Sequence, residues 1–255
     1  MSDCVKPSSL DVRSTSSRAG KSFAARHAEC VFVAALSKTL LKAYVDDVRE
    51  RAAKAGRDPR KLKIYNLITV IVDETDEKAR AKFEEYKQYV SYDGSLVFMS
   101  GWSGIDFSQY APTDSVKKVE TNAIHSLIEH LTSDGKNWTI DELAKWGGIG
   151  GVGPVFVGSP TTVADILQEW SEETGVDGYN LAYAVTPETF EDVVNLLVPE
   201  LQKRGVYPTV YKPGTLREKL FGDGPYLSET HPAHGYRDIE AVKAREAAAA
   251  NQKTA

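Results

Sequence analysis

Ser16-Ser17-Arg18-Ala19-Gly20-Lys21-Ser22-Phe23-Ala24-Ala25-Arg26-His27-Ala28-Glu29 is the stretch of this sequence that says most about its fold. Small hydroxyl residues and a glycine lead directly into an alanine-rich segment, a pattern typical of a helix N-terminus. The free backbone N–H groups and the positive dipole end of such a helix suit a phosphate group. We therefore expect a phosphate-binding turn close to the start of the chain.

One kind of phosphate site that this turn could form is the P-loop, G-x-x-x-x-G-K-[ST]. Gly20-Lys21-Ser22 supplies the second half of that signature, but Thr15 stands where the first glycine is needed. The strand that should precede the loop is represented only by residues 10–13. The acidic pair Asp73-Glu74, which could hold a metal ion, also reads as the first turn of a helix capped by Thr75. A P-loop nucleotide hydrolase is therefore an alternative with an incomplete motif.

A second interpretation rests on five segments that occur in the same order in a known family. The opening stretch resembles Q-A-G-S-S-x-x-G-R-x-F-A-A-x-x-A-E-x-V-F of the luciferase-like flavin monooxygenases, in the branch of the nitrilotriacetate, dibenzothiophene-sulfone and dimethyl-sulfide enzymes. The other four segments are Ala52-Ala53-Lys54-Ala55-Gly56-Arg57-Asp58-Pro59, Val157-Gly158-Ser159-Pro160 with Val163-Ala164-Asp165, Asp177-Gly178-Tyr179-Asn180-Leu181, and residues 198–205 followed by Thr215-Leu216-Arg217-Glu218. Because five collinear matches are more specific than one loop, we prefer this interpretation.

The resemblance implies an α/β fold, namely the C-terminal half of a TIM (β/α)8 barrel of the bacterial-luciferase type with a long loop or helical insertion. A complete barrel needs about 250 residues for itself, and the matched region starts midway through the family pattern. We therefore expect an incomplete barrel. Residues 1–13 resemble nothing in the family, residues 14–222 form the luciferase-like domain, and residues 223–255 form a C-terminal tail.

The resemblance also implies a function and a cofactor. A two-component FMN-dependent monooxygenase uses reduced FMN from a separate flavin reductase and O2, and a flavin peroxide oxygenates a small organic substrate, often breaking a C–N or C–S bond. Ser16 and Ser17 are expected to hold the FMN phosphate, and Gly20 to permit close backbone approach. Two departures bear on this loop: Arg13-Ser14-Thr15 replaces Gln-Ala-Gly, and Lys21 replaces Arg. No catalytic residue and no substrate are indicated.

The missing barrel half carries much of the family's chemistry, so we expect the chain alone to be inactive. The second hypothesis is a non-catalytic half-barrel remnant or scaffold. Its open strand edges favour a homo-oligomer or pairing with a complementary barrel half.

Helices and strands alternate along the chain, which predicts a parallel sheet. Helices are expected over residues 21–29, 39–55, 75–90, 115–130, 139–146, 160–175 and 187–204, and strands over residues 30–35, 62–72 and 178–185. Residues 91–115 contain Gly94, Gly101, Gly104 and Pro112 and are expected to form a long irregular excursion.

A glycine run, Gly148-Ile149-Gly150-Gly151-Val152-Gly153, formally satisfies the dinucleotide fingerprint G-x-G-x-x-G. A short predicted helix precedes it and an apolar segment follows, whereas the fingerprint needs a strand before and a helix after. We interpret the run as a flexible loop at the barrel mouth. Ser159 and Pro160 then open a helix, where Ser159 serves as a plain cap or holds a phosphate.

Composition excludes some classes of function. The net charge of −5 argues against a generic nucleic-acid surface, and no apolar run reaches transmembrane length. Of the two cysteines, Cys30 lies in an apolar strand and is expected to be a buried, inert thiol; the cytoplasm is the expected location. The histidines have no metal-ligand spacing: His125 and His130 are five residues apart, His27 is expected on a helix surface, and His231 and His234 in a solvated tail. Tyr179 and Asn180 face the barrel mouth or pack in the core.

Overall fold

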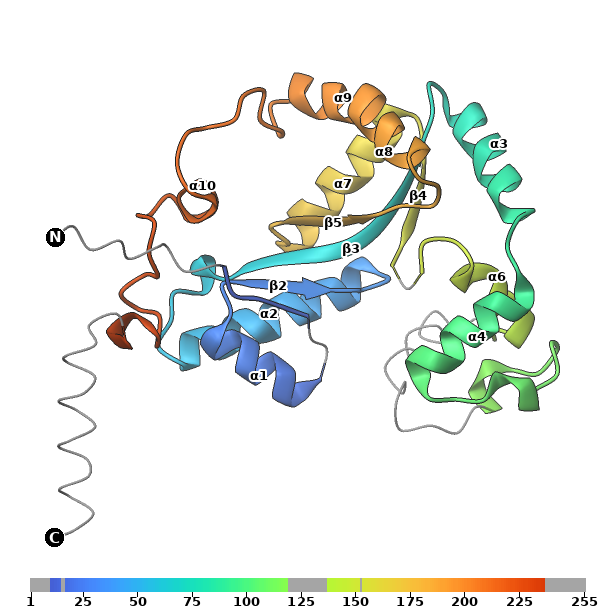
Figure 1. Ribbon diagram of the computed structural model, residues 1–255, viewed down its shortest axis with the longest axis horizontal. Coiled ribbons are helices and arrows are strands. Elements are labelled where there is room, and N and C mark those ends of the chain that lie inside the picture. Colours follow the sequence, from blue (N-terminus) through green and yellow to red (C-terminus); the bar gives the residue numbers. More distant parts are fainter. Residues whose placement is uncertain (1–9, 15–16, 119–136, 152, 237–255) are drawn as a thin grey trace, which may run out of the picture. The chain divides into compact units, whose positions relative to one another are not determined.

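The computed structural model describes residues 10–14, 17–118, 137–151 and 153–236 (Figure 1). By their internal contacts these residues divide into two units. Unit 1 is made of the described residues up to 33, of 42–65, and of those from 209 onward, and unit 2 is made of 34–41 and of the described residues within 66–208. Helix α2 (Lys38–Lys54) and strand β3 (Lys63–Val72) each contribute residues to both units.

Unit 1 contains a parallel strand pair joined by a helix. Strand β1 (Val12–Ser14) pairs with β2 (Cys30–Val33), and the first residues of β3 lie on the other side of β2. Helix α1 (Arg18–His27) makes the crossover that parallel neighbours require. Its buried residues are alanines, whose small side chains let a helix approach a sheet closely. The predicted helix–strand succession over residues 21–35 is confirmed, and Cys30 is buried as expected.

The C-terminal part of unit 1 folds onto α1 and β2. It contains the short helices α10 (Leu216–Phe221) and η5 (His234–Tyr236). Arg217 donates from Nε and Nη2 to the two carboxylate oxygens of Glu29, at 2.7 and 2.9 Å. His231 is buried, and its Nε2 lies 2.8 Å from the carbonyl oxygen of His27. The expected solvated tail around His231 and His234 is therefore wrong, because these contacts replace water.

Unit 2 is built around the second half of β3. Strand β4 (Val155–Gly158) pairs with it in parallel, with Thr69 opposite Val155, and β5 (Gly178–Ala182) also pairs with β3. The last five residues of β3 are all buried, a pattern typical of a strand covered on both faces. Helices α3 (Asp76–Lys87) and α7 (Pro160–Thr174) follow β3 and β4 along the chain (Figure 1). The sequence analysis predicted β3 and β5 but not β4.

Residues 91–115 are largely ordered, in contrast to the expected irregular excursion. They begin with α4 (Tyr92–Ser103), which is capped by Ser91 and ends at Gly104 in the left-handed conformation, and continue with the single turn η2 (Phe107–Gln109). Helix α4 packs against α6 (Ile140–Gly147) around Met99, Phe107, Ile140 and Leu143, and η3 (Val116–Lys118) adds Val116 to this cluster (Figure 1). Burial of this apolar cluster stabilises α4 and compensates for the low helix propensity of its glycines.

The predicted helix over residues 187–204 is interrupted in its middle. It consists of α8 (Glu188–Asp192), a π-helical segment η4 (Val193–Leu197) and α9 (Val198–Lys203). Pro199 has no N–H to donate to the carbonyl four residues earlier, and the wider turn lies just before it. The remaining predicted helices and strands within the described residues are confirmed to within a few residues, and the single turn η1 (Pro59–Lys61) precedes β3.

Several sequence-based expectations fall on residues that the structure does not describe. These are the helix over residues 115–130 beyond Lys118, with His125 and His130, and the end of the chain from residue 237. Across the described ranges, no helix has the length and apolar character needed to cross a bilayer. Within the same ranges, no three His, Cys, Asp or Glu residues are grouped as metal ligands would be.

Candidate functional site

The turn that opens α1 is the candidate phosphate site of unit 1. Ser17 is the N-cap, and its hydroxyl oxygen accepts a hydrogen bond of 3.0 Å from the N–H of Gly20. The first turn contains no acidic side chain, and Ser17, Arg18 and Ala19 are exposed. Because the first N–H groups of a helix have no intrahelical partner, this end can bind an anion. Ser16 lies outside the described residues.

Lys21, the lysine of the incomplete P-loop motif, is engaged elsewhere. Its Nζ lies 2.8 Å from the Asp47 carboxylate of α2 and 5.2 Å from the centre of the Tyr44 ring. Partial burial by itself raises the pKa of Asp47, but hydrogen bonds from Lys21 and Arg51 outweigh it and lower that pKa. Lys21 therefore links α1 to α2 through an ion pair and is not placed to bind a nucleotide phosphate.

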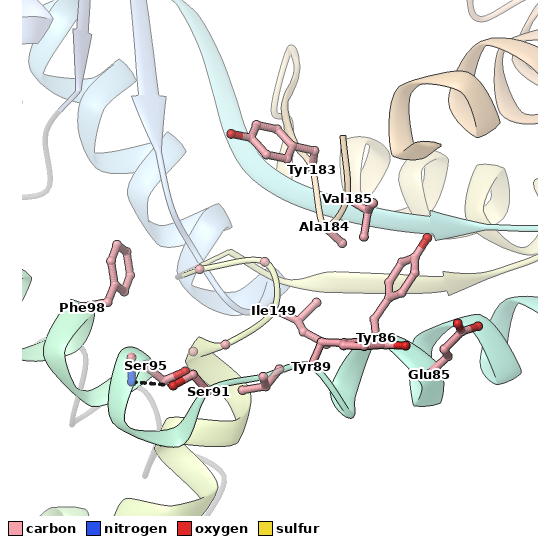
Figure 2. A pocket seen from close by; sticks show the side chains of 16 residues that line it. Glu85, Tyr86, Tyr89, Ser91, Ser95, Phe98, Ile149, Tyr183, Ala184 and Val185 are labelled. Carbon is pink, nitrogen blue, oxygen red and sulfur yellow. Dashed lines mark hydrogen bonds between the residues drawn. The ribbon is translucent and has the colours of Figure 1, made fainter. Parts of the chain in front are cut away.

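A cavity of about 700 Å³ is the candidate substrate site of unit 2 (Figure 2). It lies between the end of α3, the start of α4, the glycine turn after α6 and the segment after β5. The described residues that line it, called the pocket here, are Glu85, Tyr86, Tyr89, Val90, Ser91, Gly94, Ser95, Phe98, Gly147, Gly148, Ile149, Gly150, Gly151, Tyr183, Ala184 and Val185.

The glycine run forms a turn and not a dinucleotide-binding loop, as the sequence predicted, and this turn borders the pocket. A Cβ on Gly148 would stand 2.2 Å from Cγ1 of Val90, so no larger residue fits without movement. Gly150 has φ of +77° and would place a Cβ 2.6 Å from Cγ2 of Val155. The run follows α6 and leads into β4, and this order is incompatible with a dinucleotide fingerprint.

Tyr86 connects the pocket to a cluster of charged side chains that the sequence analysis missed. Its hydroxyl donates to Glu188 at 2.9 Å, and burial together with this carboxylate raises the pKa of Tyr86. Lys82, on the same helix, lies 2.8 Å from Asp192, 3.2 Å from Asp73 and 3.6 Å from Glu188. No local pattern relates Lys82 to Asp192, because 110 residues separate them.

Ser159 is a structural cap and not a phosphate ligand. Its hydroxyl oxygen accepts from the N–H of Thr162 at 3.3 Å, which confirms the predicted cap. Its own N–H donates to the Asp76 carboxylate at 2.6 Å, and this and related hydrogen bonds lower the pKa of Asp76. The negative charge already at this helix end leaves no place for a phosphate. Tyr179 is half-buried and donates to the carbonyl of Leu167, so it packs in the core.

Comparison with known proteins places these features in a family. The family model described as luciferase-like monooxygenase matches residues 10–178. The chain is 44% identical to dimethyl-sulfide monooxygenase of Hyphomicrobium sulfonivorans over 86% of this chain and 46% of the relative. It is 41% identical to long-chain alkane monooxygenase of Geobacillus thermodenitrificans, over 88% of this chain and 47% of that protein. It is 36% identical to nitrilotriacetate monooxygenase component A of Aminobacter aminovorans, over 87% of this chain and 50% of that protein.

Solved structures agree with the sequence relatives. The crystal structure of DmoA from Hyphomicrobium sulfonivorans superposes with a TM-score of 0.82 at 42% identity, covering 89% of this chain and 48% of that one. Riboflavin lyase, crystallised with modified FMN and its substrate riboflavin, superposes with a TM-score of 0.76 at 30% identity. The match covers 89% of this chain and 50% of the lyase chain. The chain spans about half the length of the relatives that it matches. The predicted α/β fold is confirmed, the P-loop alternative is not retained, and the chain belongs to the luciferase-like monooxygenase family.

Proposed function

We propose that this chain is the FMN-binding part of a two-component monooxygenase that acts on a small organic substrate with O2. The observation that carries the proposal is the exposed, Ser17-capped end of α1, which lies within the stretch matched to the family. Three relatives are named monooxygenases, and a riboflavin lyase of the same fold holds a modified FMN. A separate flavin reductase would supply the reduced cofactor.

The end of α1 fits an FMN phosphate. The hydroxyl oxygen of Ser17 already accepts the N–H of Gly20, so its proton is left to donate to a phosphate oxygen. The neighbouring N–H groups of the first turn would donate as well, and no acidic residue in that turn opposes the charge. We propose that Ser16 adds a second hydroxyl and that Gly20 allows close approach. Lys21 remains with Asp47.

Bound reduced FMN would supply the two electrons that reduce one atom of O2 to water while the other atom enters the substrate. The chain's own contribution is to bind and orient. Ser17 and the first turn of α1 would hold the phosphate, while the aromatic side chains of the pocket would contact the substrate and reduce its exposure to water. Cleavage of a C–N or C–S bond is the outcome that we propose for such an oxygenation.

We also propose that activity requires a second copy of the chain or a complementary barrel half. The chain spans about half of its relatives, and several of its described apolar side chains are exposed, among them Val194, Val210 and Tyr211. Covering such side chains would favour association.

Titration of the full chain with oxidised FMN, followed by flavin fluorescence, tests the phosphate site. In Ser17→Asp the helix keeps a good N-cap, but its carboxylate repels a phosphate, so we expect FMN affinity to fall at least tenfold. Riboflavin, which has no phosphate, should bind both proteins equally. Ser159→Ala is the matched control, because that cap lies beside the Asp76 carboxylate. FMN affinity unchanged in Ser17→Asp would overturn the assignment.

A further inference from the structure

The charge of the pocket lining limits what the pocket can bind. Among the described residues that line it, Glu85 is the one charged side chain, and none is Lys, Arg or His. The lining also includes the aromatic side chains of Tyr86, Tyr89, Phe98 and Tyr183, of which the last three are 78%, 52% and 58% exposed (Figure 2). A guest therefore meets apolar rings, neutral hydroxyl groups, backbone and one negative charge.

Cations on the helices that border the pocket are already paired. In α3, Lys82 lies among Asp73, Glu188 and Asp192, and Lys87 pairs with Glu84 at 2.8 Å. The other described pairs on α3 and α6 are Lys78–Glu74, Arg80–Glu77 and Lys145–Asp141. A carboxylate entering the pocket would have to compete with one of these acidic partners for its cation.

Four of the backbone donors at the pocket are already engaged in hydrogen bonds within the protein. The N–H groups of Gly148 and Ile149 are bonded to carbonyl oxygens of α6. At the start of α4, the N–H groups of Gly94 and Ser95 bond to the hydroxyl and the carbonyl oxygen of Ser91. The first turn of α4 also carries Asp93, whose charge opposes an anion at this helix end.

From this lining we infer that the pocket selects uncharged, apolar small molecules and rejects polycarboxylates. The inference rests on the proposed function, since it names the substrate class of that proposed oxygenase. A carboxylate that enters the pocket gains no cationic partner among the described lining residues and is repelled by Glu85. An alkyl chain or thioether meets no such repulsion and gains apolar contact with the rings. The volume of about 700 Å³ falls in the range usual for small-molecule sites and leaves room for a guest of ten or more heavy atoms.

Two thioethers of matched chain length test this selectivity: dibutyl sulfide, which is neutral, and 3,3′-thiodipropionate, which carries two carboxylates. Binding to the full chain without flavin is measured by saturation-transfer NMR at neutral pH. We expect saturable binding of dibutyl sulfide and at least tenfold weaker binding of thiodipropionate. Equal affinity for the two, or no saturable binding of dibutyl sulfide, would contradict the inference.

Two pairs of variants locate the binding in the pocket. Phe98→Ala should weaken dibutyl sulfide binding at least fivefold, whereas Val97→Ala, exposed on the same helix but outside the lining, should not. Glu85→Arg should strengthen thiodipropionate binding at least fivefold, whereas Glu172→Arg, the same reversal of charge on α7 and outside the lining, should not. If each variant behaves like its control, the pocket is not the binding site and the inference fails.

This result is independent of the test of the proposed function. Loss of FMN binding would remove the proposed function while leaving the selectivity of the pocket measurable. Conversely, turnover of a polycarboxylate by the protein in its active assembly would support a monooxygenase and contradict the inference.

Discussion

At the scale of single residues, the Glu29–Arg217 pair is the feature of unit 1 with the largest expected effect. The side chains of Glu29 and Arg217 are 6% and 4% exposed and share two hydrogen bonds. Removing one partner of a buried pair leaves the other charge uncompensated. We expect Arg217→Met to lower the free energy of unfolding by about 3–5 kcal/mol, measured by urea denaturation with circular dichroism.

An exposed ion pair provides the control for this substitution. Lys54 and Glu50 form a pair with side chains 72% and 63% exposed, so Lys54→Met should cost at most about 1 kcal/mol. The double variant Glu29→Gln with Arg217→Met should recover part of the loss, because it no longer buries an unpaired charge. Equal costs for Arg217→Met and Lys54→Met would show that the buried pair is not the cause.

His231 makes the stability of the protein depend on pH. Its Nδ1 accepts the N–H of Ala233 at 3.1 Å, so the neutral ring donates from Nε2 to the carbonyl of His27. Burial lowers the pKa of His231 below its ordinary value of 6.5, outweighing the opposite effect of that carbonyl. The unfolded chain therefore binds a proton more readily, and stability is lost as pH falls through 6.5 towards the folded-state pKa.

The expected result is a urea midpoint that decreases between pH 7.5 and pH 5.5. In His231→Gln this part of the pH dependence should be smaller. Carboxylates with lowered pKa values, such as Asp47 and Asp76, destabilise the fold only at lower pH, where they become protonated. A pH profile identical in both proteins would exclude His231 as its source.

At the scale of elements, the glycine turn between α6 and β4 tests how closely the backbone is packed. Gly150 and Gly151 both have positive φ, +77° and +63°. A Cβ on Gly150 would contact Val155 at 2.6 Å and Thr69 at 3.0 Å, whereas one on Gly151 would meet nothing within 4 Å. Gly151→Ala should cost about 1 kcal/mol for its backbone conformation, and Gly150→Ala about 1–3 kcal/mol more.

Thermal unfolding followed by tryptophan fluorescence would compare the two variants, because Trp146 and Trp170 lie in unit 2. If Gly150→Ala is no less stable than Gly151→Ala, the close approach of the turn to β4 is not a constraint.

The elements also show where local signals were sufficient. Caps predicted from single residues, such as Ser159 and Thr75, are confirmed because a cap depends on residues three positions away. Helix α4 was missed, since its glycines lower the local helix propensity and its stability comes from contacts of Met99 with residues of α6. The π-helical segment before Pro199 was also missed, although a proline inside a predicted helix indicates a local irregularity, because it has no N–H to donate to the preceding turn.

At the scale of the whole molecule, we predict self-association. Val210 and Tyr211 are 73% and 96% exposed, and Val206 and Tyr207, a few residues earlier in the sequence, are also exposed. Light scattering coupled to size-exclusion chromatography should give a mass of at least twice that of one chain. The double variant Val210→Ser with Tyr211→Ser should shift the equilibrium towards the monomer, whereas Val97→Ser, exposed to 71%, should not. A monomer at every concentration would contradict the prediction.

The order of helices and strands, most caps and the family follow from the sequence by itself, because they depend on residues that are close in the chain or on motifs in a set order. The capped helix end at Ser17 also follows from the sequence, and the structure confirms the cap. That Ser16 and this turn bind the FMN phosphate stays a prediction. The partners of charged side chains were decided only by the tertiary structure. Glu29 and Arg217 are 188 residues apart, and Lys82 and Asp192 are 110 apart, so packing alone brings them together. The pocket has the same origin, since its walls come from three separate stretches of the chain.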